Sequence, residues 1–296
     1  MQELDQFMEG TMIRKASQGD LQAIEGFLAP RAATSMFLSG NLRDYGLNAT
    51  GSPKATTVWL SERDDGISGV FGLTEAGYFM FEAPEFAAED GPALRQVLAG
   101  RQISALTGEA GKAEALLAAL ELDRSQIGFS DAEPHFRLKL KDLQMPSGGS
   151  TLRPMHAEDV PLITEWRHAY DKEIFGSADL PEIRQRSTAR AEALVDSGRG
   201  RILELGGLPV AMTAFNAVLP ETVQIGGVYT PPGQRSRGFA RRAVALHLAE
   251  AHEEGVQEAI LFASGTAAIR AYQKLGFERI GDYRLVEFSA PVTAGG

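Results

Sequence analysis

The chain contains no cysteine among its 296 residues. This absence excludes disulfide bonds, a thiolate nucleophile and cysteine-ligated metal sites, and we expect a cytoplasmic protein. Long apolar runs are also missing, because no stretch approaches the ~18–20 residues that a membrane-spanning helix needs. The first residues, MQELDQFMEGT, are acidic and lack the apolar segment of a secretory signal. We interpret residues 1–11 as an N-terminal extension and expect no membrane partner.

Basic residues are scarce: 29 Lys and Arg stand against 39 Asp and Glu, a net charge of −10. This balance argues against a nucleic-acid partner, which needs a basic face, and favours a cationic or amine-bearing substrate. The chain has five histidines, and His247 and His252 do not have the spacing of an H-E-x-x-H zinc helix. We therefore expect no metal. The G-x-S-x-G pattern of serine hydrolases is absent too.

The stretch LQMPSGGS, residues 143–150, has the composition of a flexible linker. It separates two patterned segments, residues 12–142 and 151–290, and a short tail, residues 291–296, follows. In the second segment, strand-like and helix-like patterns alternate, which predicts an α/β fold. Its clearest elements are a hairpin turning at Gly206–Gly207, a helix from Phe239 to Glu254 with an apolar stripe, and the buried strand EAILFAS.

The first segment repeats the order of the second. MIRKASQGDLQAIEGFLA reads like TLRPMHAEDVPLITEWRHA, TTVWLSERDDGISGVFGLT like the later hairpin, and AGYFMFEAPE like IGGVYTPPGQ. We predict two diverged copies of one architecture. Chance similarity between two α/β halves is the alternative.

An arginine-rich stretch, YTPPGQRSRGFARRAV, begins at Tyr229. Pro231 and Pro232 end the preceding strand, since proline cannot donate to a sheet. Arg235, Gly238 and Ala240 then fit the pattern [R/Q]-x-x-G-x-[G/A] directly before a helix. The unpaired N–H groups of a helix start stabilise an anion, glycine allows close backbone approach, and Arg235 and Arg237 add charged donors. The pattern predicts a phosphate site.

The pattern alone is weak, because RDYGLN and RDDGIS match it nearly as well in places where no helix follows a strand. For Arg241 and Arg242 we favour the simpler interpretation, an ordinary solvated helix face.

Together, IGGVYTPPGQRSRGFARRAVALHLAEAHEEG and AILFASGTAAIRAYQKLGFERIGDYRLVEF resemble the GNAT superfamily of N-acetyltransferases. The resemblance is specific over residues 150–288 and loose over residues 12–142. It implies two tandem GNAT-like α/β (layered α+β) domains, each a mixed, mostly antiparallel sheet flanked by helices, the first one lacking the CoA loop. It also implies acetyl-CoA as co-substrate, with Val228, Tyr229 and Thr230 pairing with the pantetheine arm and Arg235, Ser236, Arg237, Gly238, Phe239 and Ala240 holding the pyrophosphate.

By the same resemblance, Tyr272 is the acid that protonates the departing CoA thiolate, which a phenol near the sulfur can do. The alternative is a buried aromatic residue packing beside Leu275 and Phe277. The sequence departs from the family in SGTAAIRAY, where members often carry an asparagine. Gly265 or Thr266 stands there instead, with Ser264 or Thr266 as the possible substitutes.

The acceptor side is less defined. The resemblance places the acceptor pocket in EWRHAYDKEIFG, so Trp166, Tyr170, Glu173 and Phe175 are candidate lining residues. Candidates for deprotonating the amine are Glu221, Glu173, and Asn216 acting through water.

At the matching place the first segment offers carboxylates: Glu82, Glu85, Glu89 and Asp90. They would repel a pyrophosphate, so this copy is expected to be a scaffold or a wall of the acceptor site. TGEAGK, residues 107–112, lacks the spacing of a Walker loop.

These observations predict an acetyl-CoA-dependent N-acetyltransferase that moves an acetyl group to a primary amine by direct attack in a ternary complex. The partner is a small-molecule or peptide amine. The alternative is a non-catalytic acyl-CoA-binding regulatory module. The sequence does not indicate the oligomeric state.

Overall fold

The computed structural model describes residues 12–64, 66–175, 180–263 and 265–295, so the predicted extension 1–11 lies outside the described residues. The chain forms two compact units. The first comprises Met1–Glu133 together with Gly281–Gly296, and the second comprises Pro134–Ile280. Among the described residues, no helix is long and apolar enough to cross a membrane.

The first unit is a mixed sheet in the order β1-β2-β3-β4-β5-β12-β6, in which β4 and β5 are parallel and β1 to β4 pair antiparallel. Its elements are β1 (Met12–Lys15), α1 (Leu21–Leu28), α2 (Ala32–Tyr45), β2 (Thr56–Arg63), β3 (Gly66–Thr74), β4 (Tyr78–Glu82), α3 (Gly91–Leu98), β5 (Ile103–Glu109), α4 (Ala110–Ala119), β6 (Ile127–Lys139) and β12 (Glu278–Val292).

The second unit continues from β6 in the order β6-β11-β10-β9-β8-β7, again mostly antiparallel, with β10 and β11 as its parallel pair. Its further elements are β7 (Thr151–Pro154), α5 (Val160–Phe175), α6 (Pro181–Ser197), β8 (Gly200–Leu205), β9 (Leu208–Val218), β10 (Thr222–Tyr229), α7 (Phe239–Glu253), β11 (Glu258–Phe262) and α8 (Thr266–Gln273).

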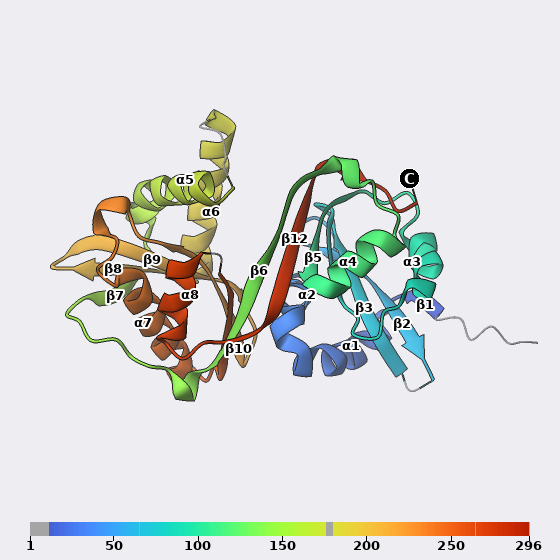
Figure 1. Ribbon diagram of the computed structural model, residues 1–296, viewed down its shortest axis with the longest axis horizontal. Coiled ribbons are helices and arrows are strands. Elements are labelled where there is room, and N and C mark those ends of the chain that lie inside the picture. The colour runs from blue at the N-terminus through green and yellow to red at the C-terminus, as the bar shows by residue number, and fades with distance from the viewer. Residues whose placement is uncertain (1–11, 65, 176–179, 264, 296) are drawn as a thin grey trace, which may run out of the picture. The chain divides into compact units, whose positions relative to one another are not determined.

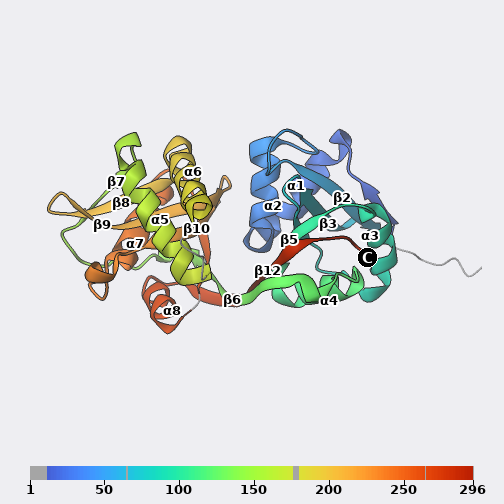
Figure 2. The same cartoon turned by 90° about the horizontal axis from the view of Figure 1, so that it is seen from above.

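Each sheet buries both of its faces under helices, because alternate residues of a strand point to opposite sides. In the second unit, Ile202 packs with residues of α5 and α6, whereas its neighbour Leu203 packs with α7. In the first unit, Met80 packs with α1 and α2, and Phe79 packs with α3 and α4. Figures 1 and 2 show this layering within each unit. The predicted fold class is confirmed: each copy is an α/β layered unit with a mixed, mostly antiparallel sheet flanked by helices.

Two long strands carry the chain from one unit to the other. β6 begins in the first unit, and its residues 135–139 pair with β11 of the second. β12 begins in the second unit, and its residues 283–292 pair with β5 of the first. The compact units therefore differ from the predicted stretches 12–142 and 151–290: each unit receives strand residues from the other half of the sequence (Figure 1).

The same three-residue ion network occurs at the start of both copies. In the first unit, Arg14 donates to both Asp20 oxygens at 2.7 and 2.8 Å, and its Nε donates to Glu62 at 2.8 Å. In the second, Arg153 donates to both Asp159 oxygens at 2.6 and 2.8 Å, and its Nε donates to Glu204 at 2.7 Å. Both aspartates also accept an N–H three residues earlier in the chain, at the start of a 3₁₀ turn. One network at equivalent positions supports duplication over chance similarity.

Most predicted elements are present, including the Gly206–Gly207 hairpin and a helix ending before Gly255. The long helix α2 and the strand β6 were not predicted. α2 has mixed polarity around its circumference, and much of β6 is exposed, so neither shows a clear apolar period.

The Arg153 network gives a stability prediction. The Arg153 guanidinium, helped by the His156 N–H, holds the pKa of the Asp159 carboxyl below its ordinary value. Arg153→Met is expected to lower the free energy of unfolding at pH 7 by about 2 kcal/mol, since it leaves two carboxylates without their bidentate partner. Arg184→Met, which breaks an exposed pair with Glu165, should cost below about 1 kcal/mol.

The pH dependence has a defined sign. Because the folded pKa of Asp159 is depressed below an unfolded value of about 4, its stabilisation is complete above that value and is lost as pH falls through the folded pKa. The difference between wild type and Arg153→Met should therefore shrink below about pH 4. Urea unfolding at several pH values measures it, and a constant difference would contradict this account.

Candidate functional site

The parallel pair at the centre of the second unit is short. β10 and β11 pair from Thr222–Glu258 to Ile225–Leu261, and within the described chain the recorded pairing ends there. β10 continues to Tyr229 and stays paired with β9 on its other side. Backbone donors and acceptors of a strand need partners, and from Gly226 onward the edge of β10 that faced β11 has no recorded pairing among the described residues. This edge, residues 226–229, is here called the fork.

Two consecutive glycines bend β10 at the fork. Its register with β9 shifts between Gly226 and Tyr229, which marks a β-bulge. Gly227 has φ +59°, a conformation that favours glycine. A Cβ at Gly226 would collide with the Asn216 side chain, and one at Gly227 would lie 3.0 Å from Nη1 of Arg167. The bulge therefore depends on both glycines and brings two polar side chains against the strand.

The loop after β10 has a curled backbone. A 3₁₀ turn, Pro232–Gln234, follows the prolines, and then Ser236 at φ +62° and Gly238 at φ +78° both adopt left-handed conformations. Alternation of this kind turns successive N–H groups into one concavity that binds anions. A serine in this region is strained. The loop is exposed from Arg235 to Gly238, so the concavity is open to a ligand.

Gly238 is the N-cap of α7, and its carbonyl accepts the N–H of Arg242 at 3.0 Å. The N–H groups of Phe239, Ala240 and Arg241 precede this first helical bond and have no partner within the helix. They point the positive end of the helix dipole into the loop. Loop and helix start lie where the sequence predicts an anion site, and they are called here the anion cradle (residues 235–241).

Arg235 braces the cradle from outside. Its Nε donates to the Thr230 carbonyl at 3.0 Å, and its Nη2 donates to both Glu173 oxygens at 2.7 and 2.8 Å. Arg237 donates to Gln234 at 2.6 Å and lies over the Phe239 ring. Arg235, one of the predicted charged donors, is thus paired with the Glu173 carboxylate. The donors that remain for a ligand are the main-chain N–H groups of the cradle.

Arg242 is not an ordinary solvated residue, contrary to the sequence interpretation. Its Nε donates to Ser150 Oγ at 3.0 Å, and its other nitrogens bind the carbonyls of Pro146 and Ser150. The linker is thereby fixed beside the helix start. Between them lies a cavity of about 90 Å³. Its lining includes linker residues 146–150, Arg237, Gly238, Phe239, Arg241 and Arg242.

Tyr272 lies on α8, which follows β11 and covers the face of the sheet that also carries Val228. Both side chains pack on one hydrophobic cluster, and the Tyr272 ring meets Phe277 edge-on at 6.0 Å. Tyr272 is half-buried, so it packs beside Phe277 as the alternative interpretation expected. Ser264, named as a substitute for the missing asparagine, lies outside the described residues.

The predicted acceptor residues separate into groups. Trp166 is buried with its ring 6.1 Å from Tyr229, and the Tyr170 ring faces the Arg167 guanidinium at 5.1 Å. Asn216 lies at the bulge, but Glu173 is held by Arg235. Glu221 lies before the first residue of β10, about 20 Å from the bulge at ~3.3 Å per residue. The side chain of Phe175 lies outside the described residues.

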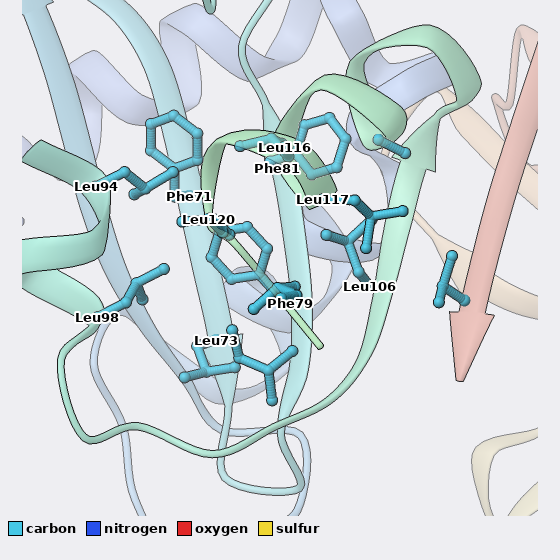
Figure 3. Packing of buried hydrophobic residues seen from close by; sticks show 14 of the residues in the cluster. Phe71, Leu73, Phe79, Phe81, Leu94, Leu98, Leu106, Leu116, Leu117 and Leu120 are labelled. Carbon is cyan, nitrogen blue, oxygen red and sulfur yellow. The ribbon is translucent and has the colours of Figure 1, made fainter. Parts of the chain in front are cut away.

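In the first unit, side chains fill the positions that correspond to the fork and to the anion cradle. The ring of Phe81 on β4 lies against Gly108 of β5, where any Cβ would collide with it. Phe81 is 4% exposed and packs with Leu106 and Leu116 (Figure 3). Before α3, the Asp90 carboxylate accepts the N–H of Ala87 at 2.9 Å, so an internal anion occupies this helix start.

The carboxylates predicted to repel a phosphate are partly buried here. Glu82 accepts a 2.5 Å hydrogen bond from Thr34, and burial raises its pKa. Asp90 is buried and pairs with Arg63 at 3.3 Å. Among the described residues, no three histidine, aspartate or glutamate side chains form a metal-binding group.

Comparison with known proteins agrees with this geometry. Residues 160–277 match the Acetyltransferase (GNAT) family. No curated protein matches the chain in sequence. Among solved structures, a Drosophila protein aligns with TM-score 0.65 at 14% identity, covering 95% of this chain and 99% of its own. A GCN5-related N-acetyltransferase from Kribbella flavida aligns with TM-score 0.56 at 20% identity, covering 88% and 95%.

A tandem GNAT protein from the clavulanic acid biosynthesis pathway aligns with TM-score 0.54 at 16% identity, covering 95% of this chain and 99% of its own. These likenesses show the fold. Residues 160–277 thus carry the match to the GNAT acetyltransferase family, and the solved structures show a GNAT-like fold over nearly the whole chain, including a tandem arrangement.

Three site features were missed from the sequence: the glycine bulge, Arg167 beside it, and the left-handed Ser236. The paired letters GG before VYT were the available signal for the bulge. No local sequence pattern indicated Arg167, because its position beside Gly227 depends on how α5 packs against β10.

Gly238→Glu should weaken acetyl-CoA binding at least a hundredfold, about 2.7 kcal/mol, because the new carboxylate enters the cradle and left-handed glycine is lost. Calorimetric titration measures it. Gly26→Glu, which adds the same charge in open space on α1 of the first unit, is the matched control and should bind normally. Equal loss in both variants would show that general charge, not the cradle, controls binding.

The first unit should bind no acetyl-CoA, since Phe81 and Asp90 fill the equivalent places. The titration should therefore give one site per chain. A stoichiometry of two, with one site surviving Gly238→Glu, would contradict this.

Proposed function

We propose that the second unit binds acetyl-CoA with the fork and the anion cradle and transfers its acetyl group to a primary amine by direct attack in a ternary complex. The observation that carries the proposal is that the fork and the anion cradle follow each other along one backbone. A single extended ligand with an amide-containing arm and a pyrophosphate can therefore bind the fork with its arm and the cradle with its pyrophosphate.

The cradle supplies main-chain N–H groups and a helix start to the pyrophosphate. The pantetheine arm extends β10 as an added strand through Val228, Tyr229 and Thr230, in the manner of strand addition at a sheet edge. The cavity lined by Arg237 and Arg241 places the guanidiniums of these two cradle residues beside the linker. It is suited to another phosphate of the nucleotide end.

In the reaction, the amine nitrogen attacks the thioester carbonyl carbon and a C–N bond forms. The negative charge on oxygen is stabilised by a main-chain N–H at the bulge, near Val228. The C–S bond then breaks and Tyr272 donates its proton to the thiolate. The proton lost by the amine passes to water held at Asn216, since Glu173 is engaged with Arg235 and Glu221 is at the far end of β10.

The alternative function is a non-catalytic acyl-CoA-binding module. The packing of Tyr272 against Phe277 favours it, because that ring also has a purely structural use. Saturable acetyl-CoA binding with no CoA release across a broad amine panel would support this alternative.

Tyr272→Phe separates the two functions. It should lower kcat about a hundredfold, the typical contribution of a general acid, and leave the Kd for acetyl-CoA unchanged. Release of free CoA thiol measures kcat. Tyr45→Phe, at an exposed tyrosine of α2, is the control. An unchanged kcat in Tyr272→Phe would show that Tyr272 is not the general acid and that its role is to pack in the core.

A further inference from the structure

Arg167 is a buried cation that is only partly paired among the described residues. Its side chain is 12% exposed, its Nε is buried and has no hydrogen-bond partner among those residues, and its Nη2 reaches Asp171 Oδ1 at 3.4 Å. A guanidinium has five N–H donors. Burial lowers the pKa of Arg167 and the Arg190 charge adds to this effect, whereas Asp171 and Tyr170 oppose it.

Asp171 is shared with a second arginine. Arg190 of α6 donates to its other oxygen, Oδ2, at 3.0 Å. Two guanidiniums thus face one carboxylate, and the group carries an excess positive charge within a chain of net charge −10. The nearby Arg235–Glu173 pair is balanced and adds no net charge. Within the described residues, the cluster of Arg167, Arg190 and Asp171 therefore holds one more cation than anion.

The position of Arg167 defines which anion. Its Nη1 lies against Gly227, at the bulge where the proposed thioester is attacked. The anion cradle begins further along the chain, at residue 235, and already has donors for the pyrophosphate. The group that reaches Arg167 is therefore part of the acceptor, which enters beside α5.

We propose that Arg167, supported by Arg190 through Asp171, binds a carboxylate of the acceptor, so that the substrates are amino acids or other amines carrying a carboxylate near the reacting nitrogen. This inference rests on the proposed function. A carboxylate fits because it accepts paired N–H bonds from one guanidinium. It also narrows the expectation, drawn from net charge, of a cationic or amine-bearing substrate to amines that carry a carboxylate.

The test compares the common amino acids with their α-carboxamides, which keep the amine and side chain and lose the negative charge. Acetyl transfer is measured by CoA release, and binding to the CoA-saturated protein by saturation-transfer NMR. For accepted compounds, kcat/KM of the acid should exceed that of the amide at least tenfold. Arg167→Gln should remove this preference by lowering the acid and leaving the amide unchanged, and Arg167→Lys should retain part of it.

Arg184→Gln, at an exposed arginine of α6 paired with Glu165, is the control and should behave as wild type. Thermal unfolding of each variant shows whether Arg167→Gln folds, and Arg167→Lys keeps the test valid if it does not.

Equal loss for acid and amide in Arg167→Gln would place Arg167 on the thioester oxygen instead and overturn the inference. Preference for amides, or no binding of any acid to the wild type, would also overturn it. Failure of the proposed function is distinct, since it appears as absence of acetyl-CoA binding or turnover. Acids that bind wild type but not Arg167→Gln would support the carboxylate site even then.

Discussion

The early end of the parallel pairing between β10 and β11 is the constraint on which the site depends. Two parallel strands satisfy each other's backbone groups only where they are hydrogen-bonded. Here the last pair between β10 and β11 is Ile225 with Leu261. The glycine bulge keeps β10 attached to β9 and frees its other edge. The loop that follows begins α7 directly, so the freed edge and the anion cradle share one continuous backbone. Most of the proposed donor contacts are therefore main-chain groups.

The two copies share one fold but differ at the place of the proposed site. Both keep the Arg–Asp–Glu network at their start and a parallel strand pair at their centre. In the first copy an aromatic ring covers the strands and an aspartate caps the following helix, whereas in the second glycines occupy the bulge and the cap. Burial of the Phe81 ring stabilises the first copy at the place that corresponds to the glycine bulge of the second. In the first copy, side-chain packing thus fills the place that corresponds to the proposed site of the second.

The sequence predicted what is local. The cradle was visible because Arg235, Gly238 and the helix period lie within a few residues, and the hairpin because Gly206–Gly207 requires only its own backbone. The missed features depend on distant segments. Arg242 binds the linker some ninety residues earlier, and Arg167 gains its meaning from Gly227. β6 and β12 each run from one unit into the other, and their exposure hides their strand period, so no local pattern encodes this exchange of strand residues.

Hydrogen exchange of the backbone amides with and without acetyl-CoA tests the central claim most directly, because the claim concerns main-chain groups. The account predicts that acetyl-CoA slows exchange at residues 226–230 and 236–241 and leaves residues 81–91 of the first unit unchanged. Protection confined to the first unit, or none at the fork and cradle under saturating acetyl-CoA, would contradict it.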